Sequence, residues 1–234
     1  MQAGRDRVYR AAIRIGTALF GLLGLRRDVR RAENIPADGA AVLAITHFGY
    51  ADFALTQQVV WRRTRRLTRF LVTDAAFAHR VAGPLLRAMG QIPVNRRAGA
   101  GAYRMAARAL LRGELVGIFP ESAVSVTETL LPFKPGAAAL AAETGAPLVP
   151  VLVWGGQRVM TKGLPLRWRR AHRAPIHIEF GTPLRLARGT GAEEGTALLR
   201  ETLAAMLAKV VAVAPDRSTR RLMARPGEQR LTHS

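Results

Sequence analysis

Three uninterrupted apolar runs restrict the fold of this chain more than any other feature of its sequence. They lie at residues 40–45, 115–119 and 148–154. Runs of this kind are typical of strands that are buried on both faces of a parallel sheet. The segments 100–112 and 137–143, which lie between the runs, have helical character. This alternation predicts an α/β fold in a single domain, with a mixed, mostly parallel sheet flanked by helices.

Two further strands are expected near the edges of the sheet. Residues 90–96 contain Pro93, which cannot donate a ladder hydrogen bond and is typical of an edge strand or an irregular one. Residues 175–180 alternate isoleucine and phenylalanine with His177 and Glu179. This alternation, with a period of two residues, predicts a half-exposed edge strand.

The composition suits one packed domain and excludes several kinds of site. The chain has 234 residues, of which 49% are hydrophobic, and it has 0 cysteines. The absence of cysteine excludes disulfides, thiolate zinc sites and cysteine nucleophiles. We also predict no metal site, because most of the histidines share no ligand spacing; these are His79, His172, His177 and His233.

The formal charge of +20 indicates an anionic partner, which could be nucleic acid, a membrane surface or a phosphorylated substrate. Arginine supplies most of the basic residues, a bias that a GC-rich coding sequence also produces. Aromatic residues make up only 6% of the chain and no DNA-binding motif is present, so no specific nucleic acid is expected. The densest basic run, residues 61–69, is either a solvated helix end or a patch that faces anionic lipid, with Trp61 at the headgroup level.

The N-terminal segment is apolar from residue 11 to residue 25, except for Arg14 and Thr17, and arginines flank it on both sides. It is shorter than the ~20 residues that span a bilayer, and Arg14 interrupts what would be the apolar core of a signal peptide. Two interpretations remain: a helix packed on the domain, or an amphipathic helix in the plane of an anionic membrane surface. We favour the second. We therefore divide the chain into a basic helical segment at 1–32, a domain at 33–213 and a basic, flexible tail at 214–234.

A histidine and an aspartate follow the first apolar run. His47 lies at the carboxyl end of this expected strand, which is where open α/β sheets place their chemistry, and Asp52 comes five residues later. Asp52 could cap the helix that begins after it. It could instead fold back to hydrogen-bond one imidazole nitrogen of His47, which would leave the other nitrogen as a base. Both interpretations stay open on these two residues alone.

Four blocks in this order resemble the glycerolipid acyltransferase family, the group that contains the 1-acylglycerol-3-phosphate acyltransferases. The first block is the H-x-x-x-x-D motif of residues 47–52, and the second is G-x-I-x-x-x-R at residues 90–96. The third, F-P-E-G-T-R-S in the family, corresponds here to F-P-E-S-A-V-S at residues 119–125. The fourth is V-P-V at residues 149–151. Together they cover about half of the chain.

The resemblance implies a fatty acyl transfer from acyl-CoA or acyl-carrier protein to the hydroxyl of a lysophospholipid such as 1-acylglycerol-3-phosphate, with no other cofactor. His47 would be the general base and Asp52 would orient it. Arg96 would hold the acceptor phosphate by charge-assisted hydrogen bonds. The remaining substrate-binding residues implied in this way are Gly90, Ile92, Phe119, Pro120, Glu121 and Lys134. The enzyme would lie on the cytoplasmic face of the cell membrane as a peripheral or monotopic protein.

The third block departs from the family pattern where the family carries arginine. Val124 takes that place, which removes one expected phosphate contact. Lys134 could compensate for the lost charge, although a lysine lacks the bidentate fork of arginine. The acceptor therefore stays open between lysophosphatidate and another lipid. Three other interpretations also stay open: Arg96 as surface charge, Glu121 as a turn cap, and a hydrolase that uses the same histidine and aspartate to activate water.

Overall fold

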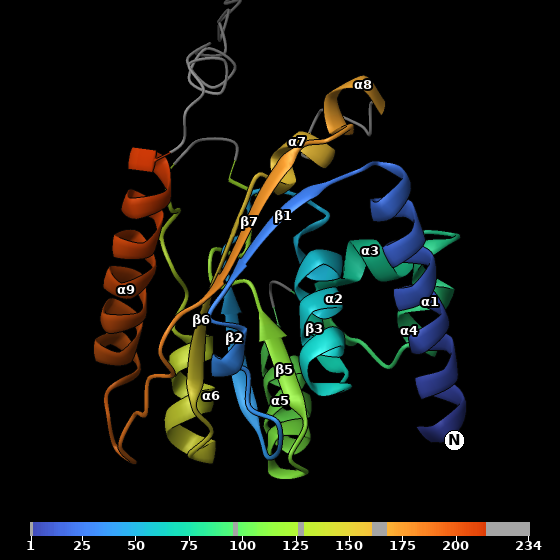
Figure 1. Ribbon diagram of the computed structural model, residues 1–234. Helices are drawn as coiled ribbons and strands as arrows, with labels where there is room; N and C mark the ends of the chain where they lie inside the picture. Colours follow the sequence, from blue (N-terminus) through green and yellow to red (C-terminus); the bar gives the residue numbers. More distant parts are fainter. Residues whose placement is uncertain (1, 96–97, 126–128, 161–167, 214–234) are drawn as a thin grey trace, which may run out of the picture.

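A computed structural model describes residues 2–95, 98–125, 129–160 and 168–213 of the chain (Figure 1). Within these residues the strands are β1 (Arg26–Arg30), β2 (Ala41–Ile45), β3 (Thr68–Thr73), β4 (Ile92–Val94), β5 (Leu115–Ile118), β6 (Leu148–Trp154) and β7 (Pro175–Phe180). The helices are α1 (Gln2–Leu22), α2 (Asp52–Thr64), α3 (Asp74–Ala78), α4 (Ala82–Ala88), α5 (Ala100–Leu111), α6 (Gly136–Thr144), α7 (Gly156–Val159), α8 (Trp168–Ala171) and α9 (Ala192–Val213), with a short 3-10 turn at Ala32–Asn34.

The described strands form a seven-stranded sheet in the order β1-β7-β6-β2-β5-β3-β4. Neighbouring strands are parallel throughout, except for the antiparallel pair β6 and β7. The fold is therefore α/β with a mixed, mostly parallel sheet, as the apolar runs predicted. The central position of β2 brings its carboxyl end next to the carboxyl ends of β5 and β6.

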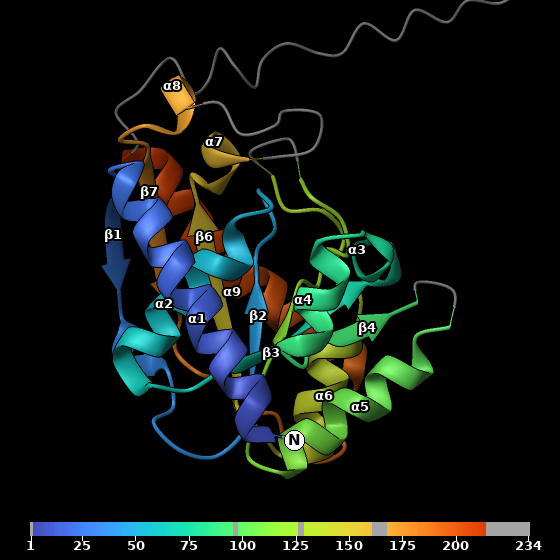
Figure 2. The ribbon, with the colours of Figure 1, turned by 90° about the vertical axis from the view of Figure 1, so that its right-hand side faces the viewer.

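Helices cover both faces of the sheet (Figures 1 and 2). Helices α5, α6 and α9 pack on one face, and α2 packs on the other with the end of α1. Along β2, Val42 and Ala44 belong to the first core, whereas Ala41, Leu43 and Ile45 belong to the second. Both faces of the strand are thus buried, which is why its sequence is apolar without interruption.

The structure confirms one of the two expected edge strands and corrects the other. Strand β4, with Pro93 in its middle, lies at one edge of the sheet. Strand β7 is not at an edge, because β1 pairs with it in parallel and forms the outer strand. The polar side chains of β7 have partners next to the sheet: Nδ1 of His177 lies 3.0 Å from Oδ2 of Asp28 in β1, and Glu179 pairs with Arg31 at 3.6 Å. Their alternation with apolar residues therefore does not mark an exposed strand.

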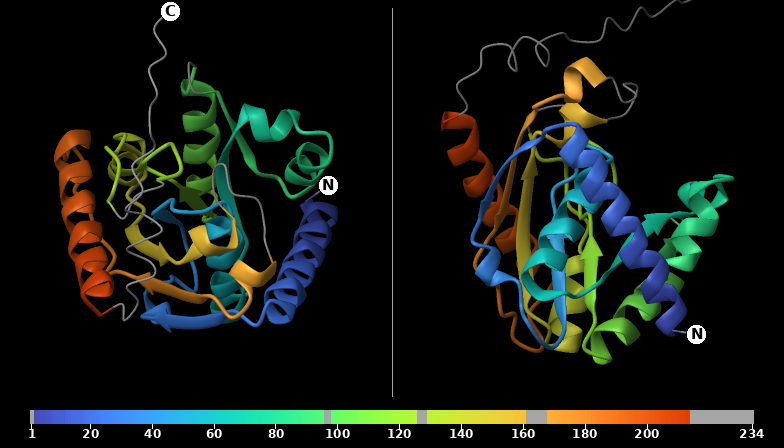
Figure 3. Two further views of the ribbon diagram at one scale, coloured as in Figure 1. Left: turned by 90° about the horizontal axis from the view of Figure 1, so that it is seen from above. Right: turned by 45° about the vertical axis from the view of Figure 1, so that its right-hand side comes forward.

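Helix α1 lies against the domain and contacts α2 and α4 (Figure 3). Tyr9, Ile13 and Phe20 are buried in this contact, whereas Ile15 and Leu22 on the outer side are 70% and 67% exposed. Within the described residues, no helix is both long and apolar enough to cross a membrane. The segment that we expected to be helical also supplies β1, so the sheet begins before residue 33. The expected tail, 214–234, lies outside the described residues.

Candidate active site

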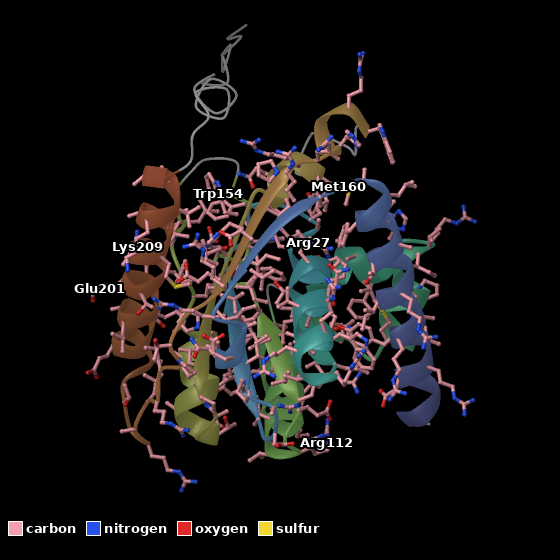
Figure 4. All side chains as sticks on the ribbon, viewed as in Figure 1. Arg27, Arg112, Trp154, Met160, Glu201 and Lys209 are labelled. Carbon is pink, nitrogen blue, oxygen red and sulfur yellow. The ribbon has the colours of Figure 1, made fainter. Side chains whose placement is uncertain are left out.

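The loop that carries His47 follows the central strand β2 at the carboxyl edge of the sheet. This is the edge at which open α/β sheets bind their ligands. Figure 4 shows Trp154, the last residue of β6, and Met160, which follows α7, towards the upper end of the molecule, whereas Arg112 lies at the opposite end. The loop is joined to this region by the Tyr50 N–H, which donates to the Met160 carbonyl at 2.9 Å.

His47 and Asp52 are in contact. The imidazole Nδ1 lies 3.3 Å from Oδ2 of Asp52, whose side chain is fully buried. The same Oδ2 accepts a hydrogen bond from the Gly49 N–H at 2.7 Å. These contacts favour the tautomer with its proton on Nδ1, which leaves Nε2 as the basic nitrogen. The N-cap of α2 is Ala51, and Asp52 is the first residue within the helix, where its Oδ2 accepts from the N–H of Gly49 outside it, so the capping interpretation is wrong.

The surroundings of the pair are largely apolar. The Phe119 ring packs against the His47 ring with 4.2 Å between their centroids, and Tyr50 approaches it edge-on at 6.4 Å. Burial raises the pKa of the Asp52 carboxyl, although the hydrogen bonds from His47 and the Gly49 N–H act in the opposite direction. In such surroundings a contact between a carboxylate and an imidazolium is stronger than it is in water.

The third block holds the backbone of His47. Glu121 is buried, and its Oε1 accepts from the His47 N–H while its Oε2 accepts from the Leu131 N–H, both at 2.9 Å. The Ser125 N–H donates to the His47 carbonyl at 2.7 Å. Burial also raises the pKa of the Glu121 carboxyl. Both carboxylate oxygens are thus bonded to backbone N–H groups, and this arrangement fixes the loop of His47. The sequence led us to expect that Glu121 helps to build the acceptor pocket or caps a turn; its role in the pocket stays a prediction.

The other predicted site residues fall into two groups. Phe119 lies on His47, and the Pro120 carbonyl accepts from the backbone N–H of Lys134, whose side chain is exposed. Gly90 and Ile92 instead contribute to the packing of the domain. Gly90 has a φ of +69° and lies beside Arg69, and Ile92 is 4% exposed in the core. Arg96 lies outside the described residues.

Ser122 stands where the family pattern has glycine, and its backbone has a conformation that suits glycine. Its φ is +55°, in the left-handed region that favours glycine. A side chain in this region costs about 1 kcal/mol, so the chain tolerates serine here at a small loss of stability. Sequence reasoning missed the structural use of Ser125, although this residue is part of the third block. Sequence reasoning placed Gly155 and Gly156 at the end of strand β6 but missed that Gly156 packs against the loop of His47.

Comparisons with known proteins agree with this geometry. The family model described as Acyltransferase matches residues 26–154, more than half of the chain. The chain belongs to the acyltransferase family. It is therefore an acyl-transferring enzyme, and the resemblance seen in the four blocks is confirmed.

The relatives and a structural neighbour are consistent with this assignment. The chain is 32% identical to a 1-acyl-sn-glycerol-3-phosphate acyltransferase of Bacillus subtilis over 62% of its own length and 74% of that protein. It is 28% identical to a chloroplastic 1-acyl-sn-glycerol-3-phosphate acyltransferase of Brassica napus, of which it spans 40%. The crystal structure of the 1-acyl-sn-glycerophosphate acyltransferase of Thermotoga maritima shares the fold, with a TM-score of 0.71 over 90% of this chain and 83% of that chain, at 22% identity.

Proposed function

We propose that this acyltransferase moves a fatty acyl group from a thioester donor, acyl-CoA or acyl-carrier protein, to the free hydroxyl of 1-acylglycerol-3-phosphate or a related lysophospholipid. The contact between His47 and Asp52 at the carboxyl end of β2 is the observation that carries the proposal. The acceptor class rests on the relatives, which are named as 1-acyl-sn-glycerol-3-phosphate acyltransferases.

In the proposed reaction, Nε2 of His47 removes the proton of the acceptor hydroxyl as its oxygen attacks the thioester carbonyl carbon. The new C–O bond forms, the C–S bond breaks, and the proton passes to the departing thiolate. Asp52 holds the ring and stabilises the imidazolium that exists between these proton transfers. The family resemblance implies no acyl-enzyme, and the chain has no G-x-S-x-G motif that would suggest one, so in the proposed reaction the acyl group moves directly between the two substrates.

The acceptor phosphate is bound by basic side chains. Arg96 is proposed for this contact because of its place in the second block, and Lys134 because its exposed side chain follows the third block. Val124 stands where the family carries an arginine. We therefore include lysophospholipids other than 1-acylglycerol-3-phosphate among the candidate acceptors.

We also propose that the enzyme binds the cytoplasmic face of the cell membrane as a peripheral or monotopic protein. The outer face of α1 supports this, because it exposes Ile15, Leu19 and Leu22 and is followed by the arginines of β1. Apolar side chains beside arginines are typical of helices that lie in the interface of an anionic bilayer.

His47→Ala tests the mechanism. We expect turnover with labelled acyl-CoA and a panel of lysolipids to fall by about 10³-fold or more, because the base is lost, while the fold and the thermal midpoint stay close to those of the wild type. His79→Ala, at an exposed histidine, is the control. Near wild-type turnover of His47→Ala would exclude the mechanism, and release of free fatty acid in place of acylated lipid would indicate a hydrolase.

A further inference from the structure

The turn after β6 lies directly against the loop that carries the two proposed reactive side chains. A Cβ atom built on Gly156 would lie 2.0 Å from Oδ1 of Asp52, and one built on Gly49 would lie 2.5 Å from the carbonyl carbon of Gly156. Side-chain atoms do not approach other atoms this closely. The backbone at Gly156 is therefore packed against both the Gly49 backbone and the Asp52 carboxylate.

Position 156 requires glycine because the Asp52 carboxylate is so close to it, and not because of the backbone angles. Gly155 has a φ of +94°, whereas Gly156 is the first residue of the short helix α7 and is outside the left-handed region. A larger residue could adopt the backbone angles of Gly156. Its Cβ, however, would displace the carboxylate or the turn.

The two oxygens of Asp52 have different surroundings. Oδ2 contacts His47 Nδ1 and accepts from the Gly49 N–H. Oδ1 is buried and has no hydrogen-bond partner among the described residues. A Cβ on Gly156 would point at this oxygen, so Oδ1 packs on the side of Gly156 that carries no side chain. The rotation of the carboxylate is therefore fixed by hydrogen bonds on one side and by packing on the other.

The turn itself is held at both ends. The side-chain Oε1 of Gln157 accepts from the Gly155 N–H at 3.0 Å, which closes the turn. The Met160 carbonyl accepts from the Tyr50 N–H at 2.9 Å, which joins the end of α7 to the His47 loop. These two hydrogen bonds fix the backbone of the turn, so Gly156 can stay in position against the Asp52 carboxylate.

We propose that Gly156 is a positioning residue for the reaction: its bare Cα forms the back wall that keeps the Asp52 carboxylate turned so that Oδ2 faces His47. The inference rests on the proposed function, because it assigns a role to this wall only if His47 and Asp52 act as the base and its partner. Gln157 supports the wall by closing the turn.

Gly156→Ala is the direct test. We expect kcat to fall by ~10–100-fold with KM within about twofold of the wild type, because a displacement of about 1 Å in a reacting group can cost ~10²-fold while the substrate contacts stay in place. Gly101→Ala is the matched control, because its Cβ would meet nothing within 4 Å in α5, and it should keep wild-type kcat. Wild-type kcat in Gly156→Ala would overturn the inference.

A double-mutant cycle separates positioning from general damage. In an Asp52→Ala background the carboxylate is gone, so adding Gly156→Ala should lower kcat by no more than about twofold and should cost little thermal stability. Losses that multiply in the double variant would overturn the inference. If Gly156→Ala does not fold, Gln157→Ala takes its place, with an expected ~3–10-fold loss in kcat at unchanged KM, and an unchanged kcat there would contradict the inference. An inactive wild type would instead exclude the proposed function.

Discussion

Asp52 combines a proposed role in the reaction with a cost in stability. Its side chain is fully buried, Oδ1 has no hydrogen-bond partner among the described residues, and burial raises its pKa. An acid whose pKa is higher in the folded chain than in the unfolded one binds its proton more tightly when folded. Its ionisation therefore lowers the free energy of unfolding as the pH rises from the unfolded pKa, about 3.9, through the folded one.

Replacing Asp52 by asparagine should therefore separate stability from activity. At neutral pH we expect Asp52→Asn to raise the free energy of unfolding by about 1 kcal/mol, or about 2–4 °C in thermal midpoint. We expect kcat to fall by ~10²–10⁴-fold, because the imidazolium loses its carboxylate. The stability difference should shrink as the pH is lowered towards the folded pKa of Asp52, since the wild type then gains a proton. Thermal unfolding over a pH series checks this, and a variant that is less stable than the wild type at pH 7 would contradict it.

The residues of the site were easier to predict than their contacts. His47 and Asp52 could be selected because they follow an apolar run that is typical of a buried strand and because they form the first of the four blocks. The role of Glu121 could not be predicted, because its partners are the backbone N–H groups of His47 and Leu131, which the folded loops bring together. The need for glycine at Gly156 likewise depends on a contact between segments that are far apart in the chain.

At the scale of elements, the same difference separates the central strands from the outer ones. Strands β2, β5 and β6 are apolar on both faces, so their sequences identify them as buried strands. Strand β1 reads R-R-D-V-R and has no apolar pattern, because it lies at the edge and its side chains are mostly exposed. Without β1, β7 looks like the outer strand. The order of strands in a sheet is set by contacts between distant segments, which local patterns do not report.

The basic run at residues 61–69 is partly structural. Arg62, Arg63 and Arg65 are exposed at the end of α2, as the solvated interpretation predicted, and the lipid-facing interpretation stays a prediction. Trp61 packs on the domain, and the guanidinium groups of Arg10 and Arg65 lie 5.6 Å and 5.7 Å from its ring centroid. Arg66 donates to the carbonyls of Pro36, Gly39 and Gly113. Arg69 is buried, pairs with Glu114 at 2.7 Å and donates to the Met89 carbonyl at 2.8 Å. A count of positive charges alone does not separate these arginines from exposed ones.

Two arginines of this run should therefore differ in their effect on stability. Arg69→Met should lower the free energy of unfolding by about 3 kcal/mol, because it leaves the half-buried Glu114 without its closest partner and the Met89 carbonyl without a donor. Arg62→Met, at an exposed position of α2, should change it by less than about 0.5 kcal/mol. Urea unfolding of both variants measures the difference. Equal effects would show that the buried contacts of Arg69 contribute little.

At the scale of the whole molecule, the exposed face of α1 and the proposed reaction site have a consistent arrangement. Helix α1 runs towards the end of the molecule at which α7 lies, and α7 packs on the His47 loop (Figures 1 and 3). Ile15, Leu19 and Leu22 are spaced by four and three residues, so they share one side of the helix. A membrane that bound this side of α1 would lie near the carboxyl edge of the sheet, where the proposed lipid acceptor would enter.

The double variant Ile15→Glu, Leu22→Glu tests this membrane contact. Burying one large apolar side chain contributes about 1.5–3 kcal/mol, so losing two should weaken binding to anionic vesicles by at least ~10-fold, even if each is only partly inserted. Leu111→Glu is the matched control, because Leu111 is similarly exposed at 75% but lies at the end of α5, before β5, and so at the opposite edge of the sheet.

Flotation with vesicles that contain phosphatidylglycerol measures membrane binding, and a gel shift over a salt series measures binding to DNA. Binding to DNA should be lost steeply with salt in all variants, because it rests on arginine charge alone. Unchanged flotation of the double variant would show that this side of α1 is not the membrane contact, and binding to DNA that withstands high salt would show that the positive charge serves nucleic acid.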